Sequence, residues 1–234
     1  MEKTIIVMPV ANEEATMGQV LEEILALPYD NLYVYPVIDN YSKDRTEEII
    51  RSFESTGRVK CIFYKESRGV ITCYLEGFRQ ALLDGASRII EMDGGGSHSP
   101  SEIPQFIEKL DEGYDCVWGS RFVEGGGISE QPLYRRILSG GGTLLANVVL
   151  GTKLKDMTSG FEGFQAEVLK NLKLDKFLSL GHMYQTEMRY YCRNLNTVEV
   201  PIHYIGGSSS LKFKSVTEAL KILFMLKKHE KEIR

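Results

Sequence analysis

Two acidic residues stand where apolar segments end, and they are the first candidates for a ligand site. Asp39 follows the apolar run at residues 33–38, and Asp93 follows the run at residues 88–92 and opens the loop DGGGSH. If both runs are strands of an open α/β sheet, both carboxylates lie at the carboxyl edge, where such sheets bind ligands. The pair therefore predicts a binding site on that edge.

Glycines gather in four short clusters, and each cluster allows the backbone to approach a ligand closely or to form a mobile loop. The chain has 22 glycines, with clusters at residues 94–96, 125–127, 140–142 and 206–207. None of the clusters has the glycine spacing of a dinucleotide-binding loop or of a P-loop after a strand. The sequence therefore gives no support to either of these nucleotide sites.

The elements that position these residues follow from the alternation of apolar runs with segments of helical periodicity, which predicts a parallel sheet in one α/β domain. The expected strands cover residues 4–10, 32–38, 59–64, 88–92 and 115–119. The expected helices cover residues 13–27, 44–55, 70–83, 100–111, 133–150, 183–195 and 214–232. Ser99, Pro100 and Glu102 match a helix start with a capping box, so the DGGGSH loop joins a strand to a helix.

Composition excludes several classes of protein. The chain has 234 residues, of which 43% are hydrophobic and 26% are charged, as in ordinary globular domains rather than disordered, collagen-like or disulfide-rich chains. Its formal net charge of −4 provides no basic field to attract a polynucleotide, so we expect no nucleic-acid partner.

Cysteine usage suits a reducing compartment, and the apolar segments bear on export and on membrane insertion. The four cysteines are scattered without a C-x-x-C pair, and we interpret them as packing residues. The first residues lack the pattern of a secretory signal, and no run reaches the ~18 apolar residues of a transmembrane helix. We therefore expect a cytoplasmic protein that meets a membrane, if at all, at its surface.

Several motifs then occur in the order of a known family. PVANEE at residues 9–14, DNYSKDRT at residues 39–46 and MDGGGSHSP at residues 92–100 resemble the nucleotide-sugar half of family 2 glycosyltransferases. GSRF at residues 119–122, RRILS at 135–139, DMTSGF at 156–161 and QTEM at 185–188 are similar to the polyprenyl-phosphate (dolichol-phosphate) mannose synthase branch. The resemblance extends over residues 4–212.

The resemblance implies a GT-A fold, a Rossmann-like, mostly parallel sheet with helices on both faces. A nucleotide-diphosphate sugar, with GDP or UDP as its nucleotide, would lie across the strand ends. A divalent cation, Mg²⁺ or Mn²⁺, would bridge its diphosphate beside Asp93, since these cations prefer oxygen ligands. The residues expected to contact the base and ribose are Pro9, Ala11, Glu13, Asp39 and Asn40. A helix N-cap with an adjacent acid is the alternative for Asn12 and Glu13.

The motifs depart from the family pattern at several positions, among them residues 69–73, where GVITC stands in place of Gly-Leu-Gly-x-Ala. Gly95 stands where a second acidic residue is usual, which removes one carboxylate from the expected metal site. Asn40 replaces an aspartate, and Glu162 replaces the arginine that commonly follows Gly-Phe. Because Mg²⁺ keeps several waters and takes one or two carboxylates, Asp93 with the diphosphate oxygens could still hold the cation. Weak metal binding, or none, is the alternative.

The acceptor motifs match the family more closely. Arg121, Arg135 and Ser139 match positions that hold the lipid phosphate, and guanidinium groups bind phosphate oxygens bidentately. The alternative for each arginine is a solvated surface charge. A phosphate acceptor is already anionic at neutral pH, so the resemblance implies an inverting transfer without a general base, in which Asp93, Arg121 and Arg135 act by positioning and charge neutralisation.

Further polar residues have two interpretations each. Asp156 and the pair Gln185 and Glu187 either recognise sugar and orient the acceptor arginines or form a buried network, and we favour a mixed role for Asp156 and a structural role for Glu187. His98 and His182 are either diphosphate contacts or caps and surface residues. His203 is interpreted as a buried core residue.

The chain divides into a glycosyltransferase domain at residues 1–211 and a basic amphipathic helix at residues 212–234. The latter segment has seven basic and three acidic residues, so it either docks on anionic lipid or packs on its own domain. A separate membrane anchor is a further alternative. The function expected first is transfer of mannose or glucose to polyprenyl phosphate. The alternatives are transfer to a saccharide hydroxyl and a catalytically weak sugar-nucleotide-binding protein.

Overall fold

The computed structural model describes residues 2–66, 69–129, 133–179, 181, 183–206, 221–226, 228 and 229, with only the backbone described at residues 133–139. Its strands are β1 (Thr4–Val10), β2 (Leu32–Asp39), β3 (Ile62–Tyr64), β4 (Arg88–Glu91), β5 (Cys116–Ser120), β6 (Gly127–Ser129), β7 (Glu162–Gln165), β8 (Thr197–Pro201) and β9 (His203–Ile205). Its α-helices are α1 (Met17–Leu25), α2 (Thr46–Ser52), α3 (Val70–Leu83), α4 (Ile103–Asp111), α5 (Leu133–Leu150), α6 (Ala166–Asn171) and α7 (Tyr184–Cys192).

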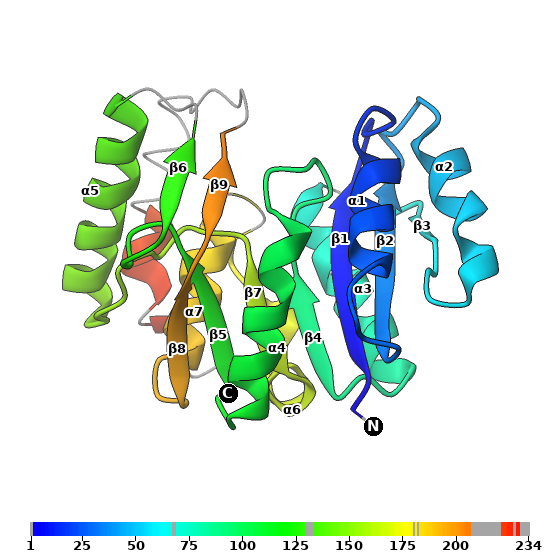
Figure 1. Ribbon diagram of the computed structural model, residues 1–234. Helices are drawn as coiled ribbons and strands as arrows, with labels where there is room; N and C mark the ends of the chain where they lie inside the picture. Colours follow the sequence, from blue (N-terminus) through cyan, green and yellow to red (C-terminus); the bar gives the residue numbers. More distant parts are fainter. Residues whose placement is uncertain are drawn as a thin grey trace.

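Seven strands form one mostly parallel sheet in the order β3-β2-β1-β4-β7-β5-β8. Strand β7 is antiparallel to both of its neighbours, and the other pairs are parallel. A second sheet pairs β6 with β9, in parallel, above the carboxyl end of β5 (Figure 1). The expected mostly parallel α/β sheet is therefore confirmed.

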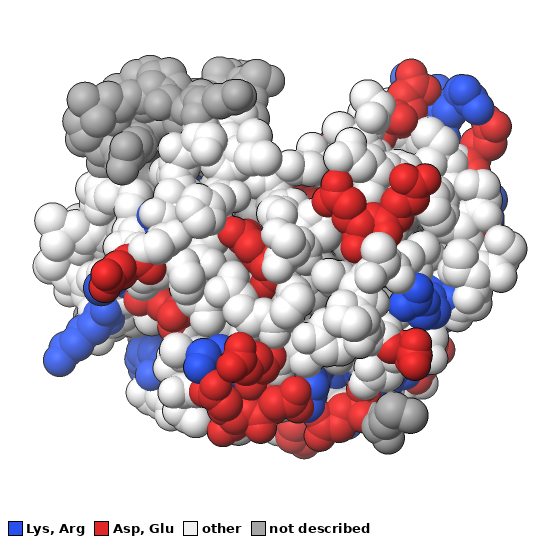
Figure 2. Space-filling model, viewed as in Figure 1, with Lys and Arg blue, Asp and Glu red and all other residues white. Residues whose placement is uncertain are grey.

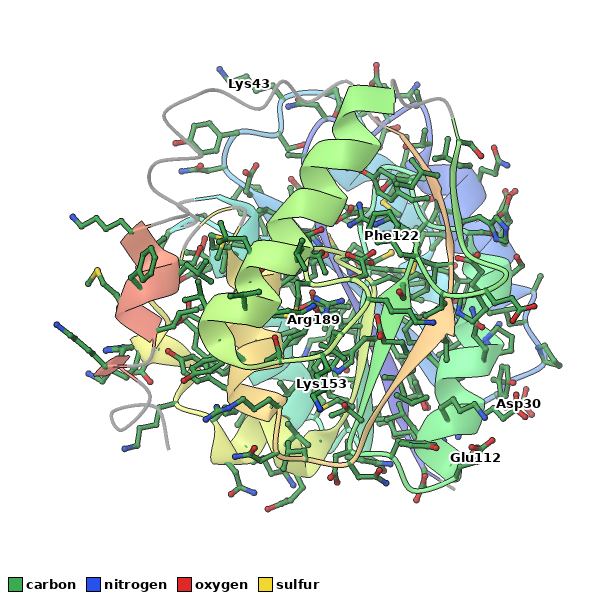
Figure 3. All side chains as sticks on the ribbon, turned by 90° about the vertical axis from the view of Figure 1, so that its left-hand side faces the viewer. Asp30, Lys43, Glu112, Phe122, Lys153 and Arg189 are labelled. Carbon is green, nitrogen blue, oxygen red and sulfur yellow. The ribbon has the colours of Figure 1, made fainter. Side chains whose placement is uncertain are left out.

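Helices cover both faces of the sheet, because alternate side chains of the central strand enter opposite cores. In β1, Ile5 and Val7 join the core formed with α3 and α7, whereas Ile6 and Met8 join the core formed with α1 and α4. Figure 1 shows α1 and α4 in front of the sheet and α3 and α7 behind it. In the view of Figure 3, α5 lies in front of the rest of the molecule.

One glycine permits close packing of α3 on the sheet. A Cβ atom on Gly77 would lie 2.2 Å from Cγ1 of Val7 in β1 and 3.0 Å from Cγ2 of Val37 in β2. Only a residue without a side chain fits there unless the strand or the helix moves.

The start of the fourth helix lies at the predicted residue, but its hydrogen bonds differ from a capping box. A short 3-10 turn, Pro100–Glu102, precedes α4, and no side chain caps it. Glu102 instead accepts a hydrogen bond from the backbone N–H of His203 at 2.7 Å. His203 was expected in the core, and that interpretation is wrong, since its side chain is 66% exposed. Glu102 thus ties the loop after β4 to the small sheet.

Candidate functional site

The predicted donor residues and one predicted acceptor residue share the carboxyl edge of the sheet. Pro9 lies near the end of β1, Asp39 ends β2, Asp93 lies two residues beyond β4, and Arg121 directly follows β5. These four strands run in the same direction. Figure 2 shows the upper edge of the molecule hollowed between the loops next to β1 and the side occupied by β6 and β9.

The loops that follow β1 and β2 are joined by hydrogen bonds. Asn12 has a positive φ of 57° and uses its backbone N–H and its Oδ1 to bond Ser42 and Lys43, respectively. The backbone N–H of Glu13 donates to Oγ1 of Thr46 at 2.7 Å. Asn12 is therefore a bridge between the two loops and not a helix N-cap, and α1 begins only at Met17.

The residues predicted to contact the base and ribose lie along this joint. Asp39 is buried, and its Oδ1 accepts hydrogen bonds from the N–H groups of Tyr41 and Ser42, which fixes the turn after β2. Asn40 is exposed and donates to the carbonyl oxygen of Lys65. Pro9 and Ala11, like Glu13, are partly buried at the end of β1. The structure thus gathers these five residues at one margin of the hollow.

Asp93 is oriented by two hydroxyl groups and remains accessible. The hydroxyl of Tyr74, a buried residue of α3, donates to its Oδ1 at 3.2 Å, and Oγ of Ser97 donates to its Oδ2 at 3.2 Å. The Asp93 side chain is 39% exposed. A carboxylate held by neutral donors and open to solvent is suited to bind a cation.

The glycine at position 95 faces a second carboxylate. A Cβ atom on Gly95 would lie 2.9 Å from Oε1 of Glu13. Burial raises the pKa of Glu13, a hydrogen bond from Thr16 opposes this rise, and the charges of Asp44 and Asp93 raise the pKa further. The donor set therefore fits a divalent cation, since it combines two neighbouring carboxylates with open space.

Among the described residues, no group of three or more His, Cys, Asp or Glu side chains forms a complete metal-ligand set. A cation held here would need oxygen atoms from a ligand or from water to complete its coordination.

His98 is buried between the donor and acceptor sides. Its Nδ1 accepts a hydrogen bond from the backbone N–H of Asp93 at 3.2 Å, and its ring packs against Phe161 and Tyr204. Burial lowers the pKa of His98, the charge of Asp93 opposes this effect, and the charge of Arg121 adds to it. Burial therefore favours the neutral form of His98 and makes it a packing residue, which corrects its interpretation as a cap or surface residue.

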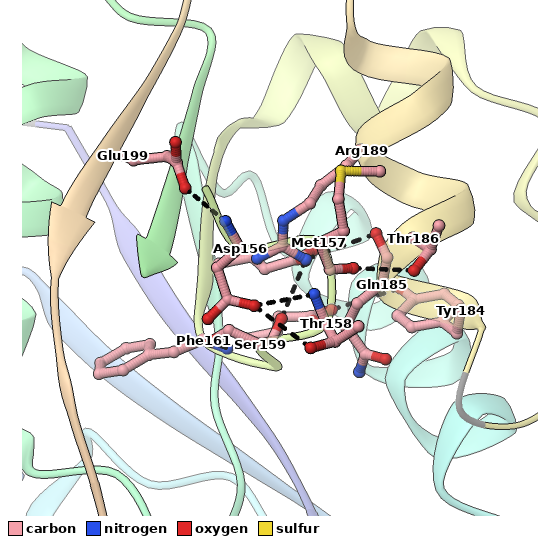
Figure 4. A network of polar contacts seen from close by, with 12 residues as sticks. Asp156, Met157, Thr158, Ser159, Phe161, Tyr184, Gln185, Thr186, Arg189 and Glu199 are labelled. Atoms are coloured by element: carbon pink, nitrogen blue, oxygen red, sulfur yellow. Dashed lines mark hydrogen bonds and ion pairs between the residues drawn. The ribbon is translucent and has the colours of Figure 1, made fainter. Parts of the chain in front are cut away.

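Arg121 is held by an almost completely buried aspartate. Its Nε and one terminal nitrogen donate to the two oxygens of Asp156 at 2.7 and 2.8 Å, and the latter nitrogen also donates to Thr158. Burial acts to raise the pKa of Asp156, but the hydrogen bonds and charge of Arg121 outweigh it and lower that pKa. Glu199 in turn accepts the backbone N–H of Asp156 (Figure 4). Arg121 is thus positioned rigidly, which supports the interpretation of Asp156 as an orienting residue.

The side chains of Arg135 and Ser139 lie outside the described part of the chain, although both residues belong to α5. His182 also lies outside it. Their predicted contacts with phosphate stay predictions.

A buried network of charged residues behind the site was not expected from the sequence. Arg189 of α7 donates to the carbonyl oxygen of Ser159 (Figure 4). It also contacts the carboxylate of Glu162, and both charged side chains are fully buried. Burial raises the pKa of Glu162 to about 8 against the opposing charge of Arg189. Nearby, Glu187 accepts the backbone N–H groups of Leu178 and Ser179, which is the structural role expected of it.

Gln185 is brought close to Asp93 across Gly160. A Cβ atom on Gly160 would lie 3.3 Å from Nε2 of Gln185 and 3.7 Å from Oδ1 of Asp93. In the same helix, Thr186 donates to the carbonyl oxygen of Met157 (Figure 4). Helix α7 thus supports the loop at residues 156–161, which faces the hollow.

Solved structures with the same arrangement define the class of fold. Glucosyl-3-phosphoglycerate synthase from Mycobacterium tuberculosis, in complex with Mn²⁺, uridine diphosphate and glucosyl-3-phosphoglycerate, matches with a TM-score of 0.68 at 16% identity and covers 100% of this chain and 81% of that one. S. aureus TarS in complex with UDP-GlcNAc matches with a TM-score of 0.65 at 17% identity, over 98% of this chain and 66% of that one. The protein has the GT-A fold of glycosyltransferases.

Comparison of amino-acid sequences identifies the family of the protein. The profile of Glycosyl transferase family 2 matches residues 5–173, and the chain belongs to this family. It is 28% identical to polyprenol monophosphomannose synthase of Mycolicibacterium smegmatis, over 94% of this chain and 84% of that protein. It is 30% identical to dolichol-phosphate mannosyltransferase of Pyrococcus furiosus, over 99% of this chain and 65% of that protein. It is 29% identical to undecaprenyl-phosphate mannosyltransferase of Micrococcus luteus, over 93% and 91%.

Proposed function

We propose that this enzyme transfers a hexose, mannose or glucose, from a nucleotide-diphosphate sugar to a polyprenyl phosphate, with inversion at the anomeric carbon. The observation that carries the proposal is that Asp93 and Arg121 meet at the carboxyl edge of the sheet. The carboxylate of Asp93 lies 3.9 Å from Nδ1 of the buried His98. Tyr204 contacts both the His98 ring and the Arg121 guanidinium. Asp93 offers a carboxylate for a donor complex, and Arg121 offers a guanidinium for an anion. The names of the three relatives, all polyprenyl-phosphate mannosyltransferases, agree with this arrangement.

The donor nucleotide is proposed to lie along the joint between the loops after β1 and β2. Asp39 and Asn40 present a carboxylate and an amide there, which suit the hydroxyl groups of a ribose and the polar edge of a base. Pro9 and Ala11 provide an apolar surface next to them. GDP and UDP are both compatible with these groups.

The diphosphate is proposed to sit at Asp93, with Mg²⁺ or Mn²⁺ held by its carboxylate. When bound, this cation would stabilise the negative charge that develops on the leaving nucleoside diphosphate. Tyr74 and Ser97 hold the Asp93 carboxylate in one orientation, so little reorganisation is needed on binding.

The acceptor phosphate is proposed to bind Arg121, together with Arg135 and Ser139 of α5. Asp156 fixes the plane of the Arg121 guanidinium and balances its charge in the absence of a ligand. Because a phosphate monoester is already ionised at neutral pH, the nucleophilic oxygen needs no base to deprotonate it. Positioning and charge neutralisation then supply most of the rate.

A long polyprenyl chain would have to stay in lipid while its phosphate reaches the site, so we propose that the enzyme works on the cytoplasmic surface of a membrane. Helix α5 exposes Leu144, Leu145 and Val148 and carries no charged residue between 137 and 150. Within the described part of the chain, no helix is both long and apolar enough to span a bilayer. The basic segment at residues 212–234 would add attraction to anionic headgroups.

The test is transfer of radiolabelled sugar from GDP-mannose, UDP-glucose and UDP-mannose in the presence of polyprenyl phosphate in mixed micelles. We expect label in the solvent-extractable lipid with one of these donors, and loss of that label when a chelator is added. Label found only in water-soluble saccharide would instead support the hydroxyl-acceptor alternative. Binding of a nucleotide sugar without transfer to any acceptor would support the weak sugar-nucleotide-binding alternative.

A further inference from the structure

The second carboxylate of the cation site comes from a different loop than the family pattern implies. We propose that Glu13, in the loop after β1, replaces the acidic side chain that is missing at Gly95 and binds the divalent cation together with Asp93. This inference rests on the proposed function, because the cation serves the same diphosphate. It also changes the role of Glu13, which the resemblance assigns to the base and ribose.

The first support is the position of the Glu13 carboxylate directly over Gly95. A Cβ atom on Gly95 would lie 2.9 Å from Oε1 and 3.3 Å from Oε2 of Glu13. The first distance is shorter than real contacts of a Cβ atom, so a side chain at position 95 would require the end of the Glu13 side chain to move. The carboxylate of Glu13 thus lies next to the place where a side chain at position 95 would begin.

The second support is the close approach of the loop after β4 to the end of β1 at Gly94, the residue before Gly95. A Cβ atom on Gly94 would lie 2.2 Å from Cγ1 of Val10 and 3.1 Å from the carbonyl oxygen of Pro9. The loop after β4 therefore packs directly against the end of β1. This contact fixes the distance between the loop that carries Glu13 and the loop that carries Asp93.

The backbone holds Glu13 in place without help from its carboxylate. Its N–H donates to Thr46, and its carbonyl oxygen accepts the N–H groups of Thr16 and Met17. Among the described residues, the carboxylate accepts one side-chain hydrogen bond, from the hydroxyl of Thr16 at 3.3 Å from Oε2. A substitution of this side chain thus leaves the fold of the loop intact and leaves its oxygens available to a ligand.

Two carboxylates of like charge on adjoining loops repel each other unless a cation lies between them. Two carboxylates together with diphosphate oxygens and water form an oxygen ligand set of the kind that Mg²⁺ and Mn²⁺ prefer. Glu13 and Asp93 would therefore restore the two-carboxylate ligand set that Gly95 removes.

The test measures Mn²⁺ binding directly, by the loss of the free-ion electron paramagnetic resonance signal, with GDP or UDP present. We expect Glu13→Gln to weaken Mn²⁺ binding about tenfold or more, since a ligand charge is lost. The matched control is Glu14→Gln, because Glu14 is the adjacent acid, is exposed and faces the backbone N–H of Arg45. The control should bind Mn²⁺ like the unaltered enzyme.

A double variant that moves the carboxylate from position 13 to position 95 provides a second test. Gly95→Asp in the Glu13→Ala background, where the shortened side chain leaves room for a Cβ atom at position 95, returns a carboxylate to the site from the loop after β4, and we expect it to recover Mn²⁺ affinity relative to Glu13→Ala alone. If this double variant recovers nothing while folded, as judged by circular dichroism, the inference is overturned.

Nucleotide affinity measured in chelator separates this inference from the proposed function. We expect Glu13→Gln to leave metal-free nucleotide affinity unchanged. A loss there, with unaltered Mn²⁺ binding, would return Glu13 to the base and ribose and overturn the inference alone. If the enzyme binds no Mn²⁺ and still transfers sugar in the presence of chelator, the inference about Glu13 is overturned. The proposed transfer to lipid phosphate would be unaffected by that result. Failure of every nucleotide to bind would reject both.

Discussion

A carboxyl group in the core provides the sharpest prediction about stability. Glu91, the last residue of β4, is fully buried. The hydroxyl of Tyr184 donates to its Oε2 at 3.3 Å, and its Oε1 has no hydrogen-bond partner among the described residues. Burial raises the pKa of Glu91 well above its usual range, and the charge of Glu162 adds to the rise, while Arg189 opposes it. The raised pKa favours the protonated form of Glu91 in the folded enzyme.

The sign of the pH effect follows from this raised pKa. The unfolded chain releases the proton of Glu91 near pH ~4.3, whereas the folded chain keeps it to a higher pH. Between the unfolded and the folded pKa the folded state holds up to one more proton than the unfolded state, so the free energy of unfolding falls as pH rises, by up to about 1.4 kcal/mol per pH unit for this group. The contribution is complete below the unfolded pKa and is lost as pH rises through the folded pKa.

The perturbation is Glu91→Gln, which keeps the shape of the protonated group and removes its titration. We expect the free energy of unfolding of this variant to fall less steeply as pH rises above the unfolded pKa of ~4.3, by up to about 1.4 kcal/mol per pH unit relative to the unaltered enzyme. Denaturant unfolding followed by the fluorescence of Trp118, the single tryptophan, measures this slope. Trp118 is buried, and the guanidinium carbon of Arg189 lies 5.0 Å from its ring centroid.

The control is Glu167→Gln, because Glu167 is an exposed acid on α6 that pairs only loosely with Lys170, at 3.5 Å. Its slope should match that of the unaltered enzyme. An unchanged slope in Glu91→Gln would refute the reasoning, because Glu91 would then be ionised in the folded state or titrate as in the unfolded chain.

Three further predictions concern packing, the acceptor and the cation. Gly77→Ala should lower the free energy of unfolding by about 1–3 kcal/mol, because the added methyl group would overpack against Val7. The control, Gly141→Ala in α5, should raise it by about 0.5–1 kcal/mol, because no described atom lies within 4 Å of the added Cβ atom. Denaturant unfolding measures both effects, and equal midpoints for the two variants would contradict the packing of α3. Arg121→Lys keeps the charge but loses the two-pronged bond to Asp156, so its KM for polyprenyl phosphate should rise about tenfold or more, with donor KM as the unchanged control. Asp93→Asn should lower kcat about 10²-fold and abolish the effect of added Mn²⁺ on nucleotide affinity; a retained Mn²⁺ effect in titration calorimetry would argue against Asp93 as a ligand.

The elements that sequence predicted best are those whose signal is local. The bounds of β1 agree with the prediction, as do those of α3 and α5, because an unbroken apolar run or a steady helical period marks each of them. Strand β7 was not predicted, since its four residues include Glu162, Gly163 and Gln165 and show no apolar run. Its antiparallel insertion between β4 and β5 is a long-range property of the sheet.

The candidate site likewise contains some residues that the sequence predicts and others that it does not. Asp39, Asp93 and Arg121 were predictable because each follows a strand and lies in a recognisable motif. The partnership of Arg189 with Glu162 was not, because the two residues are 27 positions apart and buried charges pair through tertiary structure. The replacement of the usual arginine by Glu162 was the one available signal, since a buried acid requires a cation nearby. The position of Glu13 over Gly95 likewise depends on how two loops meet.

The central claim is that the acceptor of the sugar is a phosphate held by arginine rather than a hydroxyl activated by a base. The most direct measurement compares initial rates of transfer from the preferred nucleotide sugar to a short-chain polyprenyl phosphate and to the polyprenol of the same length. Our account predicts glycosylation of the phosphate and none of the alcohol. Equal rates with the two acceptors, or glycosylation of the alcohol alone, would contradict it.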